Sequence, residues 1–290
     1  MASIAIPHPA SPAPRKAWSS WQTWGVIMLT PYILVFLVFV LYPVSYGLWL
    51  ARHQQSYVTL FDDPVFFRTV VNTIVFLLVA VNLKFILALF LSGFFVHERA
   101  WIRGLSVIFI IPWAVPAIPT IFSIRFMLNP EWGIINSVIF RLTGLDGPNW
   151  LNNPTLGLTM AGVVHIWKAL PFWTLILIAG RLAIPREQYE AASVDGATGW
   201  QKFKYVTWPS IRTLYLTSTI LSMIWTLGDF NSVYLLTGGG PADLTHVLAT
   251  LGIRYIRLDQ VDQAMATIVV ALPFVLPLVY FMMKRLSADE

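Results

Sequence analysis

Long apolar stretches alternate with short polar segments along most of the chain. Six stretches have the roughly 20 predominantly apolar residues that an α-helix needs to cross the hydrocarbon core of a membrane. They cover residues 24–51, 69–96, 104–128, 156–181, 211–236 and 263–283. All six are expected to be helices, because lipid offers no water to hydrogen-bond an open backbone. The pattern therefore predicts an all-α polytopic membrane protein with six transmembrane helices.

The composition excludes a soluble protein. Of the 290 residues, 57% are hydrophobic and 11% are charged, whereas soluble domains are about 45–50% apolar and about 25% charged. The chain has no cysteine, so disulfides and thiol chemistry are excluded. Residues 1–20, rich in Pro, Ala and Ser, are predicted to form a disordered cytoplasmic tail. Residues 21–290 are predicted to form one transmembrane domain.

The positive charges predict an orientation. If the spans alternate in direction, most Lys and Arg residues outside them fall on the side of the N-terminus, including Arg99, Arg103, Lys202 and Lys204. The positive-inside rule then places both termini in the cytoplasm. The net charge of +5 is interpreted as topology and not as affinity for nucleic acid.

Two connections have a character of their own. Residues 134–142 form a short amphipathic pattern between the third and fourth spans, and it is expected to lie on the outer membrane face. The segment 183–209, between the fourth and fifth spans, is too polar to be embedded. It is predicted to be a cytoplasmic helix–turn–helix, with its turn at Asp195–Gly196 and its end at Pro209.

The motifs for several catalytic chemistries are missing. The stretch TGGGPADLT lacks the lysine of a phosphate-binding loop. The five histidines have no metal-ligand spacing, and no nucleophile–base pattern is visible. The chain is therefore expected to be no enzyme and to bind no metal or cofactor.

The polar segment carries the most specific motif. Glu190, Ala191 and Ala192 are followed after three residues by Gly196, after nine more by Val206, and then by Trp208 and Pro209. This resembles the EAA loop of binding-protein-dependent ABC importer permeases, with Val and Trp at two positions where the family has Ile and Leu. The alternative is an ordinary interfacial helix hairpin. The motifs IPWAVPAIP, WGIIN, HIWKALPF, VDGA and YLLTGGGP extend the resemblance to the carbohydrate, maltose-type branch.

The resemblance implies a type I importer with several partners. These are a second homologous permease subunit, two ABC ATPase subunits that bind ATP and Mg, and an extracytoplasmic substrate-binding protein. It also implies a bacterial cytoplasmic (inner) membrane location. In the EAA loop, Glu190 would meet basic groups of the ATPase, Ala191 and Ala192 would permit close approach, and Gly196 would allow the turn. Asp195 and Pro209 complete the expected coupling set.

A substrate cavity at mid-membrane is also implied by the resemblance. Its expected residues are Trp113, Ala117, His165, Trp167, Lys168, Phe172, Ser222, Thr226 and Asp229. The spacing of Ser222, Thr226 and Asp229 places them on one helix face, and aromatic rings beside hydroxyls suit a sugar. The aromatic residues can equally be packing or belt residues, and the hydroxyls can bond between helices.

Charged residues within spans need partners, because an isolated charge in lipid is costly. Lys168 is expected to pair with Asp229; in the alternative, His165 or Lys168 meets an anionic sugar. Lys84 is expected to snorkel or to face a partner subunit. The Gly238, Gly239, Gly240 and Pro241 stretch is expected to dock the binding protein or to be a flexible turn.

The sequence therefore predicts the membrane-spanning permease subunit of an ATP-driven ABC importer for a sugar or related carbohydrate, a polyol or anionic sugar included. Two other classes remain. An ion-coupled secondary transporter would need inverted repeats and carboxylate relays, for which Asp229 alone offers itself. A membrane enzyme acting on lipid-linked sugars would need a catalytic cluster, which the sequence does not display.

Overall fold

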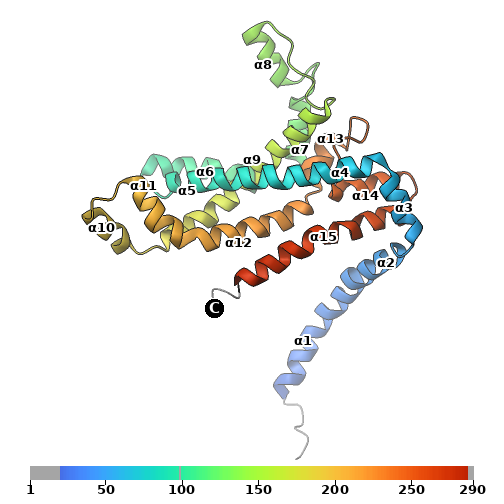
Figure 1. Cartoon of the computed structure of the whole chain (residues 1–290), viewed down its shortest axis with the longest axis horizontal. Helices are drawn as coiled ribbons and strands as arrows, with labels where there is room; N and C mark the ends of the chain where they lie inside the picture. Colours follow the sequence, from blue (N-terminus) through green and yellow to red (C-terminus); the bar gives the residue numbers. More distant parts are fainter. Residues whose placement is uncertain (1–19, 98, 287–290) are drawn as a thin grey trace, which may run out of the picture. The chain divides into compact units, whose positions relative to one another are not determined.

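The computed structural model describes residues 20–97 and 99–286, and the regular elements in these ranges are helices (Figure 1). The α-helices are α1 (Ser20–Phe36), α2 (Tyr42–Leu50), α3 (Gln54–Asp62), α4 (Pro64–Val75), α5 (Asn82–Phe95), α6 (Ala100–Ala114), α7 (Ala117–Met127), α8 (Ile134–Thr143), α9 (Pro154–Leu182), α10 (Arg186–Val194), α11 (Gly199–Lys202), α12 (Trp208–Leu227), α13 (Asn231–Thr237), α14 (Leu248–Arg257) and α15 (Val261–Leu286). Short π-helical segments, Leu37–Leu41, Phe76–Val81 and Phe203–Thr207, join α1 to α2, α4 to α5 and α11 to α12.

The chain divides into two compact units, Met1–Trp49 and Leu50–Glu290. In the first unit, the described part is one apolar helix whose side chains are exposed on all sides, as is typical of a helix in lipid. The predicted disordered tail, except for Ser20, lies outside the described residues. Ser20 itself begins α1.

Four of the predicted stretches form long apolar helices, Trp21–Leu50, Pro64–Phe95, Pro154–Leu182 and Val261–Lys284. Two of these helices begin with a proline that follows an N-capping residue. The side chains of Asp63 and Asn153 accept backbone N–H groups of the first turn, directly before Pro64 and Pro154. A proline in the first turn needs no hydrogen-bond partner for its nitrogen, so these residues start the helices five and two positions earlier than the apolar pattern alone indicates.

The third and fifth predicted spans are not single helices. The third is the pair α6 and α7, bent by 95°, because Pro116 and Pro119 withhold backbone donors at the bend. The fifth ends at Leu227, and α13 follows as a separate helix after Gly228. Ser and Thr dilute the apolar residues of α12, so it is not among the helices that are apolar enough to span. The six-span count and the positions of the termini stay predictions.

The polar segment is a helix–turn–helix, as predicted, formed by α10, a turn with Gly196 at a φ of +75°, and α11. It lies at the end of the helix bundle away from α13 and α14 (Figure 1). The predicted helix end at Pro209 is wrong. The Trp208 N–H bonds the carbonyl of Phe203, and this π-helical shift lets the chain pass through Pro209 into α12.

The second unit is held together by α9, which packs against α5, α6, α12 and α13. Phe85 and Trp173 lie 5.1 Å apart between α5 and α9, and both are buried. Gly180 permits a close approach of α12, because a β-carbon there would lie 2.4 Å from Leu214 Cδ2. The core therefore centres on the helix that carries His165 and Lys168.

An ion-pair cluster joins three segments that the apolar pattern did not predict to meet. Arg254 of α14 donates to Asp63, at 2.6 Å, and to Asp243, at 2.8 Å. The Tyr255 hydroxyl also donates to Asp63, at 3.0 Å. Partial burial raises the pKa of Asp63, but hydrogen bonds from the Val65 N–H, Arg254 and Tyr255 outweigh it and hold the pKa below its ordinary value.

We expect Asp63→Asn to reduce the free energy of unfolding by about 1.5–3 kcal/mol, because charge-assisted hydrogen bonds are lost. A carboxyl with a depressed pKa stabilises the folded state above its unfolded pKa, here near 3.8, and this contribution disappears as the pH falls through the folded pKa. Thermal unfolding of both forms in detergent between pH 7 and 3 measures this. A stability difference that stays constant over that range contradicts the prediction.

Candidate functional site

A buried chain of polar side chains crosses the second unit. Lys84 Nζ of α5 lies 3.0 Å from His165 Nε2 of α9, and His165 Nδ1 lies 2.7 Å from Asp229 Oδ2. One histidine tautomer satisfies both contacts: the lysine donates to Nε2 and the Nδ1–H donates to the carboxylate. A neutral imidazole then links one positive and one negative side chain, so the chain of contacts carries no net charge.

The break after α12 places Asp229 at this position. α12 ends at Leu227, and Asp229 Oδ1 accepts the backbone N–H of Ser232 in the first turn of α13. One turn earlier in α12, the Thr226 hydroxyl donates to the Ser222 carbonyl at 2.7 Å and lies 3.3 Å from His165 Nε2. The carboxylate therefore serves both as the partner of His165 and as a cap of α13.

These groups line a cavity of about 420 Å³. Its walls come from α5, α6, α7, α9, α12 and α13, and its lining residues are Lys84, Trp113, Ala117, Ile121, His165, Lys168, Ala169, Trp173, Ser222, Trp225, Thr226, Asp229, Asn231 and Ser232. Half of Trp113 and of Trp225 is exposed. The cavity thus offers aromatic faces beside hydroxyl, carboxamide and charged groups, within the size range of small-molecule sites.

Lys168 and Asp229 do not form the pair considered above. Lys168 Nζ donates to the backbone carbonyls of Pro112, at 2.8 Å, and Val115, at 2.9 Å, while Asp229 is bound by His165. The expectation that Lys84 snorkels or faces a partner subunit is wrong, because its side chain is 1% exposed and contacts His165.

Most of the predicted cavity residues line this one cavity: Trp113, Ala117, His165, Lys168, Ser222, Thr226 and Asp229. Trp167 and Phe172 are not among its lining residues. Phe172 lies behind the wall and stacks on Trp113 and Trp225. Sequence reasoning missed Lys84, Trp173, Trp225 and Asn231 as cavity residues. The sequence feature that could have identified Lys84 is a charge within a predicted span. For Trp225 the only such feature is its position directly before Thr226.

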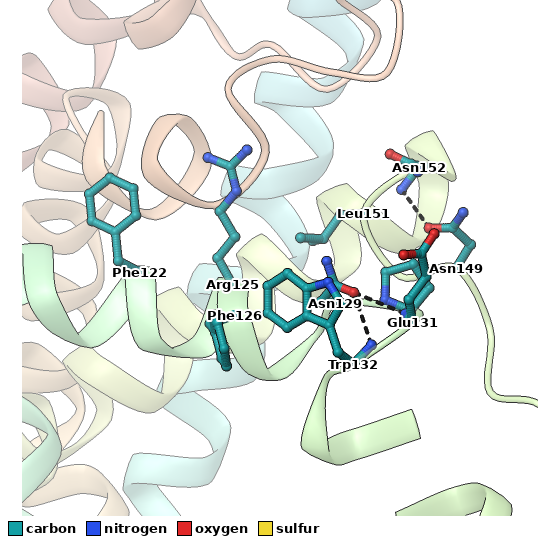
Figure 2. A pocket seen from close by; sticks show the side chains of 10 residues that line it. Phe122, Arg125, Phe126, Asn129, Glu131, Trp132, Asn149, Leu151 and Asn152 are labelled. Atoms are coloured by element: carbon teal, nitrogen blue, oxygen red, sulfur yellow. Dashed lines mark hydrogen bonds between the residues drawn. The ribbon is translucent and has the colours of Figure 1, made fainter. Parts of the chain in front are cut away.

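A larger cavity, of about 530 Å³, lies between the end of α7 and the start of α9 (Figure 2). Figure 2 shows Asn129 accepting the backbone N–H groups of Glu131 and Trp132, which shapes its wall. We assign the candidate site to the smaller cavity, because that one gathers the buried charged groups of the helices. Buried ionisable residues within membrane helices mark function more strongly than volume does.

The polar segment presents its motif outward. Glu190 and Ala191 of α10 are exposed, and Ala192 is half-buried. The segment is tied to the bundle by a 2.9 Å hydrogen bond between the hydroxyls of Tyr189 and Thr207. A capping box between Thr198 and Gln201 starts α11. The motif residues therefore lie on an ordered, protruding element.

The glycine stretch has a defined conformation. Gly238 ends α13 at a φ of +65°, and Gly239 lies under His246, where a β-carbon would be 2.1 Å from the ring. Thr245 closes the turn, with its N–H bonded to the Gly239 carbonyl and its hydroxyl to that of Gly240. The left-handed backbone conformation explains Gly238, and the close approach of His246 explains Gly239. Within the described residues, no group of three or more metal-ligating side chains gathers.

Comparisons with known proteins indicate the same class of protein, a membrane permease. Residues 66–288 match the family model described as the binding-protein-dependent transport system inner membrane component. The chain is 32% identical to the trehalose/maltose transport system permease protein MalF of Thermococcus litoralis, over 91% of this chain and 95% of that protein. It is 29% identical to the sulfoquinovosyl glycerol transport system permease protein SmoG of Agrobacterium fabrum, over 92% and 94%.

Two solved structures share the fold. A chain of a bacterial ABC transporter involved in the import of the acidic polysaccharide alginate is 26% identical, with a TM-score of 0.75, over 91% of this chain and 96% of that one. A chain of the bacterial alginate ABC transporter in complex with an alginate pentasaccharide-bound periplasmic protein is 23% identical, with a TM-score of 0.80, over 90% and 92%. The chain belongs to the family of binding-protein-dependent transport system inner membrane components, the permease subunits of ABC transporters, which are not enzymes.

Proposed function

We propose that this permease imports a carbohydrate and forms half of the translocation pathway, paired with a second permease in a bacterial inner membrane. An extracytoplasmic binding protein delivers the substrate at the side of the Gly238–Pro241 turn, and two ATPase subunits supply ATP and Mg. The observation that carries the proposal is the cavity between α6, α9 and α12. The sugar permeases among the similar proteins support the substrate class.

The cavity chemistry suits a sugar. The exposed faces of Trp113 and Trp225 offer stacking surfaces for the apolar faces of a pyranose ring. Ser222, Asn231 and Asp229 lie in the same lining and offer hydrogen bonds to hydroxyl groups. Asp229 is already held by His165 and Ser232, so its position is preorganised.

The protruding segment suits the transmission of force. Val194 is 88% exposed and Trp200 is 70% exposed, although they lie in the most polar part of the chain. Exposed apolar side chains beside Glu190 are typical of a surface that a partner protein covers. We therefore propose that α10 is the coupling helix that docks on the ATPase.

An ion-coupled mechanism has less support. A carboxylate relay needs a group that is free to exchange protons along the pathway. Among the described residues, Asp229 is the carboxylate of the cavity, and its oxygens accept hydrogen bonds from His165 and Ser232. Uptake should consequently stop when the ATPase subunits are inactivated and should be insensitive to a protonophore while ATP is maintained. Continued uptake by the ATPase-dead transporter would favour the ion-coupled class.

We expect Trp225→Ala to raise the half-saturating sugar concentration for uptake by about 2- to 10-fold, as an aromatic contact is lost. Trp167→Ala is the matched control, since this tryptophan is also partly exposed on a core helix but lies outside the cavity lining. Transport assays in proteoliposomes with trehalose, maltose and sulfoquinovosyl glycerol measure this. Equal effects of the two substitutions would count against this cavity as the sugar site.

We expect Glu190→Lys and Gly196→Leu to uncouple ATP hydrolysis from uptake. The first reverses the charge offered to the ATPase, and the second places a bulky side chain at a φ of +75°. Membrane insertion should be unchanged, since neither residue is buried. Quantified protein in membranes, ATPase rate and uptake measured together check this. Normal uptake by both variants at equal protein levels would contradict the coupling role.

A further inference from the structure

Two backbone carbonyls of the broken span cannot find backbone donors. In a continuing helix, the carbonyl of Pro112 would accept the N–H of residue 116, and that of Val115 the N–H of residue 119. Both positions are proline, which has no N–H. The same two carbonyls are therefore left without α-helical backbone donors in the bent span and in a straight, continuous α-helix. In surroundings poor in water, each such group is costly.

Lys168 supplies both missing hydrogen bonds. Its Nζ lies 2.8 Å from the Pro112 oxygen and 2.9 Å from the Val115 oxygen. It belongs to α9, which packs along α6. The two carbonyls flank the C-terminal end of α6, where the helix dipole also favours a positive charge. One side chain thus fastens the C-terminal end of α6 and the first residue of the break, where the span bends by 95°, to the neighbouring helix.

The bend carries an aromatic part of the cavity wall. Trp113 lies between the two fastened carbonyls, and its ring stacks on Phe172 at a centroid distance of 5.6 Å. Phe172 follows Lys168 by one helical turn, so both contacts come from the same face of α9. Phe172 also stacks on Trp225 at 5.8 Å. Three helices therefore meet in one aromatic stack. Lys168 fixes the backbone that carries Trp113, the ring at one end of this stack.

We propose that Lys168 is a positioning residue: it replaces the donors that Pro116 and Pro119 withhold and thereby holds the Trp113 ring in the wall of the sugar cavity. This deepens the proposed function and rests on it for the sugar. The competing role of Lys168, a direct ion pair with an anionic substrate, predicts a different outcome in each measurement below.

The first experiment follows the bend itself, without any substrate. The chain lacks cysteine, so Gly104→Cys and Ser123→Cys on α6 and α7 accept spin labels at exposed positions. The distance between the labels is measured by pulsed electron paramagnetic resonance on the assembled transporter in nanodiscs. In the protein with Lys168 we expect one narrow distribution of label–label distances. In the Lys168→Met variant this distribution should become broad or shift. Lys168→Arg, which keeps several donors, should restore it.

The second experiment separates positioning from folding. A triple variant combines Lys168→Met with Pro116→Ala and Pro119→Ala and thereby regains the backbone donors. Its melting temperature should return to the wild-type value, while the distance between the two labels should still differ from that of the wild type. In the same variant, the half-saturating concentration of whichever probe is transported, trehalose, maltose or sulfoquinovosyl glycerol, should stay raised by about 2- to 10-fold. The maximal uptake rate should change less than this concentration does.

Two results would overturn the proposal. One is an unchanged distance distribution in Lys168→Met. The other is a rise in the half-saturating concentration for sulfoquinovosyl glycerol alone, with neutral sugars unaffected, which would assign Lys168 to the substrate's anion. Because the distance measurement needs no sugar, its failure is distinct from a failure of carbohydrate uptake.

Discussion

The second unit depends on one constraint: polar groups among apolar helices must find partners within the chain, because lipid provides none. Lys84, Lys168, Arg181 and Asp229 are charged residues in or beside the apolar helices, and each has such partners. Each of these contacts joins two different helices, or a helix and a residue at a helix break. Satisfying the polar groups and fixing the helix arrangement are therefore the same process.

The helix α9 is where these contacts converge. His165 connects it to α5 and to Asp229 before α13, and Lys168 connects it to the end of α6 at the α6–α7 bend. At its other end, Arg181 donates to Ser92 and to the Leu89 carbonyl of α5. Removing one partner of such a contact leaves the other, buried or half-buried, without its hydrogen bond, and this couples the contacts to one another.

The apolar pattern predicted the long helices well, because a stretch of about 20 apolar residues has few alternatives in lipid. It predicted breaks poorly. Pro209 was expected to end a helix and does not, whereas Pro116 and Pro119 accompany a sharp bend. A lone proline can be absorbed by a π-helical shift, but two prolines three residues apart remove donors from one turn. Close prolines do not always break a helix, however, because Pro273 and Pro277 both lie within the continuous helix α15.

The sequence predicted most of the residues that line the candidate site but not the contacts between them. Helical spacing placed Ser222 and Thr226 on one face of α12, and the break after Leu227 brings Asp229 to the same cavity. The partner of each charged group was not predictable in the same way. Lys84 and His165 are 81 residues apart in sequence, and the Lys168 partners are carbonyls, which leave no mark in a side-chain pattern.

The layout of α9 and α12 also explains how a distant force can reach the cavity under the proposed function. The proposed coupling helix is bonded, through Tyr189 and Thr207, to the π-helical segment that continues directly into α12. The Arg181 guanidinium lies over the ring of Phe203 in that segment, 5.9 Å from its centroid. Under the proposed function, a displacement of α10 would act on the ends of α9 and α12, two of the helices that line the cavity. Because α9 also holds the bend through Lys168, it would move the aromatic wall relative to Ser222 and Asp229, as alternating access requires.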